Sequence, residues 1–198
     1  MTTATLTNEK VTLSAAVLYD LLTGAAIAAD SAKDAQTRLG AVYLVAEGNK
    51  LTAAATDRYR LVEGVAELDA GTLSASCLTL QDVKRILTVL KPYIKITGNA
   101  ATVEKEGYSL TVTVNGDYVL AHSLDYSLPD YAHMISDDYS PVPSVALNLS
   151  LLASMDKIPH DSSEPVTFGF TGAGKAIQIR MAHDSIKWRA LLMPMRVK

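Results

Sequence analysis

The residue types that most often carry catalysis are scattered along this chain and form no known catalytic spacing. No two of the four histidines stand in an HExxH or His-x-His arrangement: His122, His133, His160 and His183. The chain also lacks a GxSxG nucleophile elbow and a GxxxxGK[ST] phosphate-binding loop. The single cysteine, Cys77, lies in a strand-like pattern typical of a small core residue. These spacings favour a protein that is not an enzyme.

Acidic side chains offer another route to chemistry, because carboxylate oxygens bind hard metal ions. The candidates are the pair Asp137-Asp138 and the single residue Asp156. Acidic pairs in a polar linker are usually solvated. We therefore expect neither a metal site nor a cofactor.

Composition indicates a globular protein of the reducing cytoplasm. The 198 residues are 48% hydrophobic and 20% charged, which is typical of a folded chain. The segment Met1–Lys10 lacks the apolar centre of a signal peptide, and a single cysteine allows no internal disulfide. The apolar stretch Ala15–Ala29 contains Asp20 and is too short to span a membrane. The net charge of −3 neither favours nor excludes nucleic acid, because a local basic face can coexist with an acidic exterior.

The last eight residues, Leu191–Lys198, read LLMPMRVK and resemble a strand that ends at a proline. Pro194 cannot donate a ladder hydrogen bond, so a strand must end there or lie at a sheet edge. Methionines flank it on both sides, and their flexible side chains suit a surface that accepts several partners. The alternative is a last strand buried in its own core.

Hydrophobic periodicity predicts a unit of one strand, one helix and several further strands. In the first unit a strand at Val11–Leu13 leads into a helix capped by Ser14 and ending near Asp30. A polar loop, Ser31–Thr37, follows. Three strands complete the unit: Leu39–Ala46, Leu51–Thr56 and Arg60–Leu68.

The same order returns twice. The second unit has a strand at Ser76–Leu80, a helix at Gln81–Lys91 and four strand-like runs: Tyr93–Thr97, Ala101–Lys105, Tyr108–Val114 and Tyr118–Ser123. Asn115-Gly116 predicts a type I′ hairpin between the last two. The third unit has a strand at Ser144–Asn148, a helix at Leu149–Ile158 and three strands: Val166–Thr171, Ala176–Met181 and Ile186–Met193.

We therefore predict three βαβββ units of the α+β class. The first two would pair as one domain over residues 1–135, and the proline-rich segment 136–143 would be a linker. The third unit, residues 144–198, would be a half domain without a sibling. An odd number of such units predicts self-association, because an open sheet edge and an apolar helix face must be covered.

Three motifs in order resemble the bacterial β sliding clamp, the processivity ring of DNA polymerase III. Ala55–Leu61 reads ATDRYRL and is similar to the family's ATDGHRL. Leu128–Tyr131 reads LPDY and is similar to its FPDY, and Met193–Val197 reads MPMRV and is similar to its MPMRL. Arg58 stands where the family has glycine, and Tyr59 stands where it has histidine.

The resemblance implies a DNA-clamp fold, with antiparallel outer sheets and helices that line a ring. The chain matches the central domain and the second half of the last domain, so it has three units where the bacterial clamp has six. Twelve units complete the bacterial ring, which favours four chains here, with a trimer as the alternative. A shortened version would suit a phage-encoded clamp.

The resemblance also implies an apolar pocket that binds short linear motifs of polymerases and of the clamp loader. Its residues here would be Leu39, Thr56, Arg58, Tyr59, Arg60, Leu61, Pro129, Met134, Leu191, Met193, Pro194, Met195, Arg196 and Val197. The charge of Arg58 predicts a preference for more acidic peptides.

A clamp holds double-stranded DNA without reading its sequence, through cations that touch phosphates loosely. The candidates on or beside the helices are Lys33, Arg38, Lys84, Arg85, Lys91 and Lys157. The first helix has no Lys or Arg between Val11 and Asp30, which weakens the DNA interpretation for that unit. An adaptor or decoy that binds clamp-seeking peptides without closing a ring is the alternative.

Overall fold

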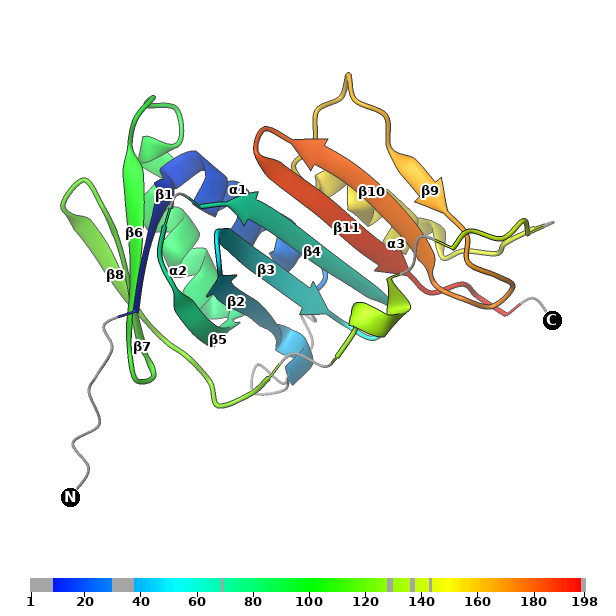
Figure 1. Ribbon diagram of the computed structural model, residues 1–198, viewed down its shortest axis with the longest axis horizontal. Coiled ribbons are helices and arrows are strands. Elements are labelled where there is room, and N and C mark those ends of the chain that lie inside the picture. Colours follow the sequence, from blue (N-terminus) through cyan, green and yellow to red (C-terminus); the bar gives the residue numbers. More distant parts are fainter. Residues whose placement is uncertain are drawn as a thin grey trace.

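The computed structural model describes residues 9–29, 38–68, 70–127, 130–135, 138–142 and 144–196. These residues form an α+β structure in which every strand pairing is antiparallel. A four-stranded sheet and a seven-stranded sheet stand at an angle to each other (Figure 1). The helices α1 and α3 lie behind the larger sheet in this view, and α2 lies between the two sheets.

The first unit runs from β1 to β4. Its elements are β1 (Glu9–Ser14), α1 (Ala15–Ala26), a 3₁₀ turn η1 (Arg38–Gly40), β2 (Ala41–Glu47), β3 (Lys50–Thr56) and β4 (Arg60–Glu67). The second unit has the same order. Its elements are β5 (Leu73–Thr79), α2 (Leu80–Leu90), η2 (Lys91–Tyr93), β6 (Ala100–Glu106), β7 (Ser109–Val114) and β8 (Asp117–His122).

The third unit is smaller. After a turn η3 (Ala132–Met134) it consists of α3 (Leu149–Ser154), η4 (Met155–Lys157), β9 (Thr167–Gly169), β10 (Ile177–His183) and β11 (Ile186–Leu192). The predicted helix at Leu149–Ile158 is thus present, with its second half wound as a 3₁₀ turn.

The first two units exchange their first strands. The smaller sheet has the order β1-β6-β7-β8, so β1 of the first unit pairs with the second unit. The larger sheet begins β5-β2-β3-β4, so β5 of the second unit pairs with the first. Helices α1 and α2 pack between these sheets and bury Leu18, Leu22, Val83 and Ile86 completely. Neither unit's sheet is complete without the other.

The third unit joins the first along one strand. The larger sheet continues β4-β11-β10-β9, with Leu61 opposite Leu191 and Ala66 opposite Ile186 across the junction. Trp188 of β11 is fully buried here. Its ring lies so close to two glycines, Gly24 of α1 and Gly64 of β4, that an added Cβ atom would come within 2.2 and 2.4 Å of it. The absence of side chains at these glycines therefore makes the slot for the indole.

The predicted hairpin at Asn115-Gly116 is confirmed. Asn115 and Gly116 have φ values of 47° and 91° between β7 and β8, as a type I′ turn requires. Gly48, with a φ of 60°, turns the chain between β2 and β3. Helix α1 ends at Ala26, and the predicted end near Asp30 lies outside the described residues.

Two predicted strands are wrong. The run Tyr93–Thr97 forms turns after Pro92, held by hydrogen bonds from Ile96 N–H to Tyr93 O and from Asn99 N–H to Ile96 O. The run Ser144–Asn148 belongs to neither sheet, because its unit has no sibling whose sheet it could join. A β propensity produces a strand only where a partner edge is present.

None of the described helices is long and apolar enough to cross a membrane.

Candidate functional site

The loop that joins β3 to β4, Thr56–Arg60, is fixed by its own side chains. The Asp57 carboxylate accepts hydrogen bonds from the backbone N–H groups of Tyr59 (3.0 Å) and Arg60 (2.9 Å). The Thr56 hydroxyl donates to the Arg60 carbonyl at 2.8 Å and accepts from the Arg58 N–H at 3.2 Å. Short polar side chains that bond nearby backbone in this way stabilise tight turns.

Arg58 occupies the left-handed backbone region of this turn, with a φ of 76°. Glycine adopts that conformation without steric cost, whereas other residues pay for it. The glycine at this place in the clamp motif is therefore explained by the turn. In this chain the same turn presents an exposed guanidinium, and within the described residues that group has no ion pair or hydrogen bond.

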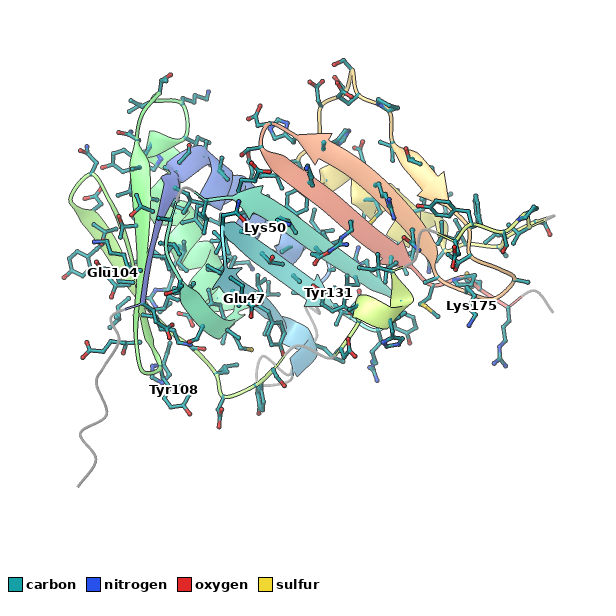
Figure 2. All side chains as sticks on the ribbon, in the orientation of Figure 1. Glu47, Lys50, Glu104, Tyr108, Tyr131 and Lys175 are labelled. Atoms are coloured by element: carbon teal, nitrogen blue, oxygen red, sulfur yellow. The ribbon has the colours of Figure 1, made fainter. Side chains whose placement is uncertain are left out.

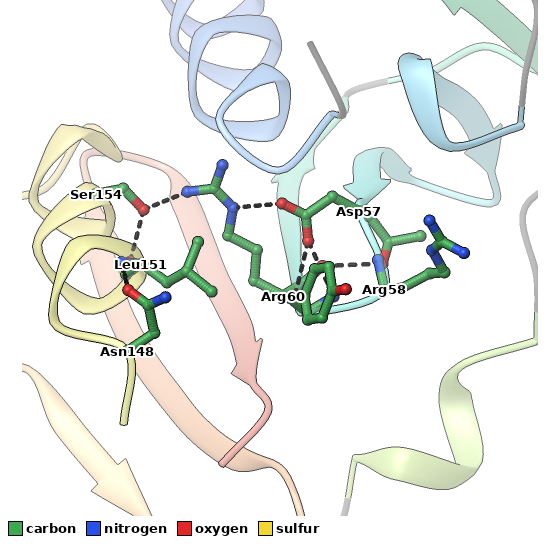
Figure 3. A network of polar contacts seen from close by, with 8 residues as sticks. Asp57, Arg58, Arg60, Asn148, Leu151 and Ser154 are labelled. Atoms are coloured by element: carbon green, nitrogen blue, oxygen red, sulfur yellow. Dashed lines mark hydrogen bonds and ion pairs between the residues drawn. The ribbon is translucent and has the colours of Figure 1, made fainter. Parts of the chain in front are cut away.

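Arg60 connects the loop to the third unit, as Figure 3 shows. Its Nε pairs with Asp57 Oδ2 at 3.0 Å in a mostly buried ion pair. Its other guanidinium end donates to the Ser154 hydroxyl of α3, which in turn donates to the Leu151 carbonyl. Asn148 caps the start of α3 through the N–H groups of Ser150 and Leu151. The loop and helix α3 are thereby held in one polar network.

A second polar network lies on the outer side of the junction between β4 and β11. Glu63, only 5% exposed, accepts a hydrogen bond from Arg189 Nε at 2.6 Å and another from the Tyr131 hydroxyl at 2.9 Å. Burial, together with the charge of Glu63, raises the pKa of Tyr131 far above its ordinary value. The network ties the chain after β8 to the sheet, where Tyr131 is labelled in Figure 2.

An open pocket of about 250 Å³ lies between these two networks. Its floor is apolar, because Leu61, Leu191, Tyr131 and Met193 pack together there. Ten residues line it: Leu39, Thr56, Arg58, Arg60, Leu61, Asp130, Tyr131, Met134, Leu191 and Met193. Four separate parts of the chain therefore build one groove: η1, the β3–β4 loop with the start of β4, the segment after β8, and the end of β11.

The C-terminal segment after β11 is held along the rim of this pocket. The Met193 N–H donates to the Tyr59 carbonyl at 2.9 Å, and the Met195 N–H donates to the Ala146 carbonyl at 2.8 Å. Met193 turns into the pocket, while Met195 is 54% exposed. The alternative of a last strand buried in its own core thus describes Leu191 and Leu192 but not the residues after them.

The structure brings together most of the residues predicted for this pocket. Eight of the ten lining residues were predicted, whereas Asp130 and Tyr131 were not. The LPDY motif, which contains both, is the signal that could have identified them. Tyr59 contributes its carbonyl and exposes its ring. Five other predicted residues do not line the pocket or lie outside the described residues. Pro194, Met195 and Arg196 follow along the tail, and Pro129 and Val197 are not described.

The structure describes the side chains of four of the six cations predicted to face DNA. Lys84, Arg85 and Lys91 lie exposed on α2 and at its end, and Arg85 pairs with Asp82 at 3.0 Å. Lys157 is exposed at the end of η4. Lys33 and the side chain of Arg38 lie outside the described residues.

Helix α1 carries an acidic group and no cation. Burial raises the pKa of Asp20, and the nearby His183, at 3.6 Å, opposes that shift. In the part of the chain that the structure describes, no three His, Cys, Asp or Glu side chains are arranged to hold a metal ion.

Comparison with known proteins gives a result by structure only. No sequence family and no curated protein matches the chain. The DNA polymerase III β subunit from Thermotoga maritima superposes with a TM-score of 0.79 at 17% identity, over 100% of this chain and 68% of that one. A ligand-bound sliding clamp from Pseudomonas aeruginosa gives 0.75 at 15% identity, over 96% and 66%.

A third similar structure, the Pseudomonas aeruginosa sliding clamp bound to griselimycin, gives a TM-score of 0.76 at 14% identity, over 100% of this chain and 68% of that one. The chain thus spans about two thirds of the length of these clamps. It has the fold of the DNA polymerase III β sliding clamps, which confirms the resemblance and the α+β clamp architecture predicted from the motifs.

Proposed function

We propose that this chain is the subunit of a DNA sliding clamp, a homo-oligomeric ring that encircles double-stranded DNA and tethers a polymerase. The observation that carries the proposal is the apolar pocket at the junction of β4 and β11, where the ATDRYRL loop and the MPMR tail meet. The clamp fold supports the same conclusion. The role is binding and positioning rather than catalysis.

The pocket suits a short peptide with apolar anchors. Leu61, Leu191, Met193 and Met134 give adaptable apolar walls that accept Leu and Phe side chains. A few polar groups around them, such as the Thr56 hydroxyl, can fix the peptide backbone. Polymerases and a clamp loader that carry such motifs are the proposed partners.

Arg58 gives the pocket a positive rim. Because its guanidinium has no partner among the described residues, it is available to pair with a carboxylate of a bound peptide. Asp130 lies on the same rim and would repel an acidic side chain of the peptide placed beside it. The acidic residue of the peptide should therefore lie next to Arg58. We expect peptides with an acidic residue next to the apolar anchors to bind best.

The sheets offer a way to close the ring. The junction within the chain pairs β4 with β11, and each is the last strand of its unit. The last strand of the second unit, β8, is the outer strand of the smaller sheet. Two copies can join β8 to β8 in the same antiparallel manner. Four chains of three units then supply twelve units; a trimer remains the second candidate.

DNA would be held through four exposed cations: Lys84 and Arg85 in the middle of α2, Lys91 directly after it, and Lys157 at the end of η4. Contacts of this kind go to phosphates, so binding would be independent of sequence and would weaken with salt. Encirclement is tested by loading the protein on nicked circular DNA. The proposal expects retention on the circle and loss after linearisation, whereas equal retention on both forms would contradict it.

An adaptor that binds clamp-seeking peptides without encircling DNA is the second candidate. The lack of any Lys or Arg in α1 favours it, because a helix facing DNA usually carries cations. A single-chain mass in solution would support this candidate over the ring.

The pocket is tested by removing one methionine side chain. We expect Met193→Ala to weaken binding of a fluorescein-labelled peptide with Leu and Phe anchors by about tenfold or more, because loss of an apolar contact costs about 1.5 kcal/mol. Met195→Ala is the matched control, since Met195 is exposed and outside the pocket. The double variant Met193→Ala/Met195→Ala should lose peptide binding but keep the same oligomeric state as the native protein. Unchanged affinity of Met193→Ala in fluorescence polarisation would reject the site.

A further inference from the structure

The first domain shows how one unit completes another. In each of its units the strand directly before the helix pairs with the first sheet strand of the sibling unit. Leu13, two residues before α1, lies opposite Ala101 of β6. Leu78, two residues before α2, lies opposite Val42 of β2. Both leucines point into the core shared by the two units.

The third unit has both the segment before its helix and a first sheet strand, but no sibling unit among the described residues to pair with either. The segment 144–148 directly precedes α3 and belongs to neither sheet. Strand β9, which corresponds to β2 and β6, has β10 as its one neighbour in the described sheet. The unit therefore has a segment before its helix that joins no sheet, and a sheet whose outer strand β9 is paired on one side only.

The segment 144–148 contacts the end of its own unit in the same way as β1 does. The β1 strand pairs with β6 on one edge, and on its other edge Val11 bridges Gly71, which follows β4. In the third unit, Ala146 accepts a hydrogen bond from Met195, which follows β11. One edge of 144–148 thus contacts its own unit, and the structure describes no strand paired with the edge that corresponds to the β6 side of β1.

The helix of the third unit is uncovered as well. Helices α1 and α2 each bury several residues, whereas α3 buries none. Leu149 at its start is 77% exposed, and Phe168 of β9 is 46% exposed. Between α3 and β9 lies an open hollow of about 330 Å³ with mostly apolar walls, including Leu152, Val166 and Ile179. In the first domain the equivalent space is filled by the sibling's helix.

We propose that a second copy of this chain completes the third unit. Two third units would exchange their 144–148 segments about a two-fold axis, so that each segment pairs with β9 of the other copy. The product is a composite domain built like the first domain, with half from each chain. A second copy is the occupant because it carries the matching 144–148 segment, the matching open β9 edge and the matching apolar hollow together.

The register follows from the first domain. The residue two positions before the helix faces the second residue of the sibling's first sheet strand, as Leu13 and Ala101 do. In the composite domain Leu147 of one copy would therefore face Phe168 of the other, and Phe168 points inward beside Ile179. Ser140 already donates to the Phe170 carbonyl at 2.7 Å, so the exchanged strand covers the residues before it, 167–169.

This inference is independent of peptide binding and of DNA encirclement, because it concerns only residues of the third unit. The test is the double variant Leu147→Cys/Phe168→Cys, oxidised at micromolar concentration and examined on a non-reducing gel. Facing Cβ atoms of antiparallel strands come close enough for a disulfide. We expect a covalent dimer from the double variant and from an equimolar mixture of the two single variants. Each single variant, and the native chain with its buried Cys77, should stay monomeric on the gel.

A disulfide closed within one chain, or none at all in the folded double variant, would overturn the proposal. A second variant keeps the test independent of cysteine chemistry. Phe168→Asp places a charge in the hollow and should at least halve the mass of the assembly by light scattering. Peptide affinity should stay within about twofold, which shows that the chain is folded and separates this test from that of the pocket. An unchanged mass would also overturn the proposal.

Discussion

At the scale of single residues, Arg58 combines a backbone cost with a proposed role in peptide binding. Its left-handed φ of 76° costs about 1–2 kcal/mol relative to an unstrained residue. The turn that imposes this conformation also presents the guanidinium on the rim of the pocket. Unfavourable backbone geometry often occurs at functional positions, which agrees with the proposed peptide site.

We predict that Arg58→Gly weakens binding of an acidic peptide by about tenfold and leaves a neutral peptide of the same anchors within about twofold. The free energy of unfolding should change by less than about 1 kcal/mol, because relief of the left-handed strain offsets the greater entropy of the unfolded glycine chain. Peptide titrations and urea denaturation measure the two effects. Arg58→Lys, which keeps the charge, is the control and should retain most of the preference for acid.

Tyr131 gives the protein a pH dependence in the alkaline range. Its pKa is raised by burial and by Glu63, so the folded state keeps the phenolic proton after the unfolded state has lost it. The unfolded state then binds fewer protons, and stability falls as the pH rises above about 10, by up to about 1.4 kcal/mol per pH unit.

We predict that Tyr131→Phe lowers stability at pH 8, where the hydrogen bond to Glu63 is lost, but makes the decline between pH 9 and 11 shallower. Urea denaturation at each pH gives the free energy of unfolding, and hence its slope against pH, for the native protein and for the variant. Burial also raises the pKa of Cys77. Cys77 is present in the native protein and in the variant, so its contribution cancels when the two slopes are subtracted. Parallel slopes in the two proteins would contradict the role of Tyr131.

At the scale of elements, the junction of β4 and β11 depends on the glycine slot around Trp188. We predict that Gly24→Ala costs about 1–3 kcal/mol of unfolding free energy, because the new methyl group overlaps the indole. Helix propensity alone would favour alanine by about 1 kcal/mol, so the sign of the effect reports the clash. In the Trp188→Leu background the same substitution should be neutral or stabilising. Equal losses in both backgrounds would show that the clash is not the cause.

Local signals were sufficient for most elements. The Asn115-Gly116 hairpin follows from two residues whose backbone preference matches the turn. The runs Tyr93–Thr97 and Ser144–Asn148 also have strand-like sequence patterns, but no partner edge lies beside them, and that absence is a property of the whole fold. Strand propensity describes what a segment can do and not where its neighbours lie.

The candidate site divides in the same way. The tail and the ATDRYRL loop could be identified as parts of one pocket because motifs carry them. The Glu63–Arg189–Tyr131 network could not be predicted, since it requires β4 to pair with β11 across 126 residues of chain. Gly24 and Trp188 meet for the same reason, and neither residue shows a local sign of the other.

At the scale of the whole molecule, two kinds of contact can close a ring of four copies. Third units would join in pairs through the composite domain, and β8 strands would join in pairs at the other end of each chain. Both contacts are two-fold, so four chains give a closed ring in which the β8 and β9 edges are covered. Two chains then hold six units, and the ring holds twelve.

A charged residue placed on β8 can test the β8–β8 contact separately from the contact between third units. Leu120 on β8 is 53% exposed, and we predict that Leu120→Lys reduces the assembly from four chains to two by blocking the pairing of β8 strands. The remaining dimer should still form the Leu147–Phe168 disulfide when those cysteines are added. Light scattering and the non-reducing gel together check this outcome, and a four-chain mass would remove β8 from the interface.

The measurement that tests the central claim most directly is the mass of the native protein in solution. Size-exclusion chromatography with light scattering at micromolar concentration should give four times the chain mass of 21.2 kDa. That result would agree with three units per chain and twelve per ring. A stable species of 21.2 kDa over the same concentration range would contradict both the ring and the composite domain.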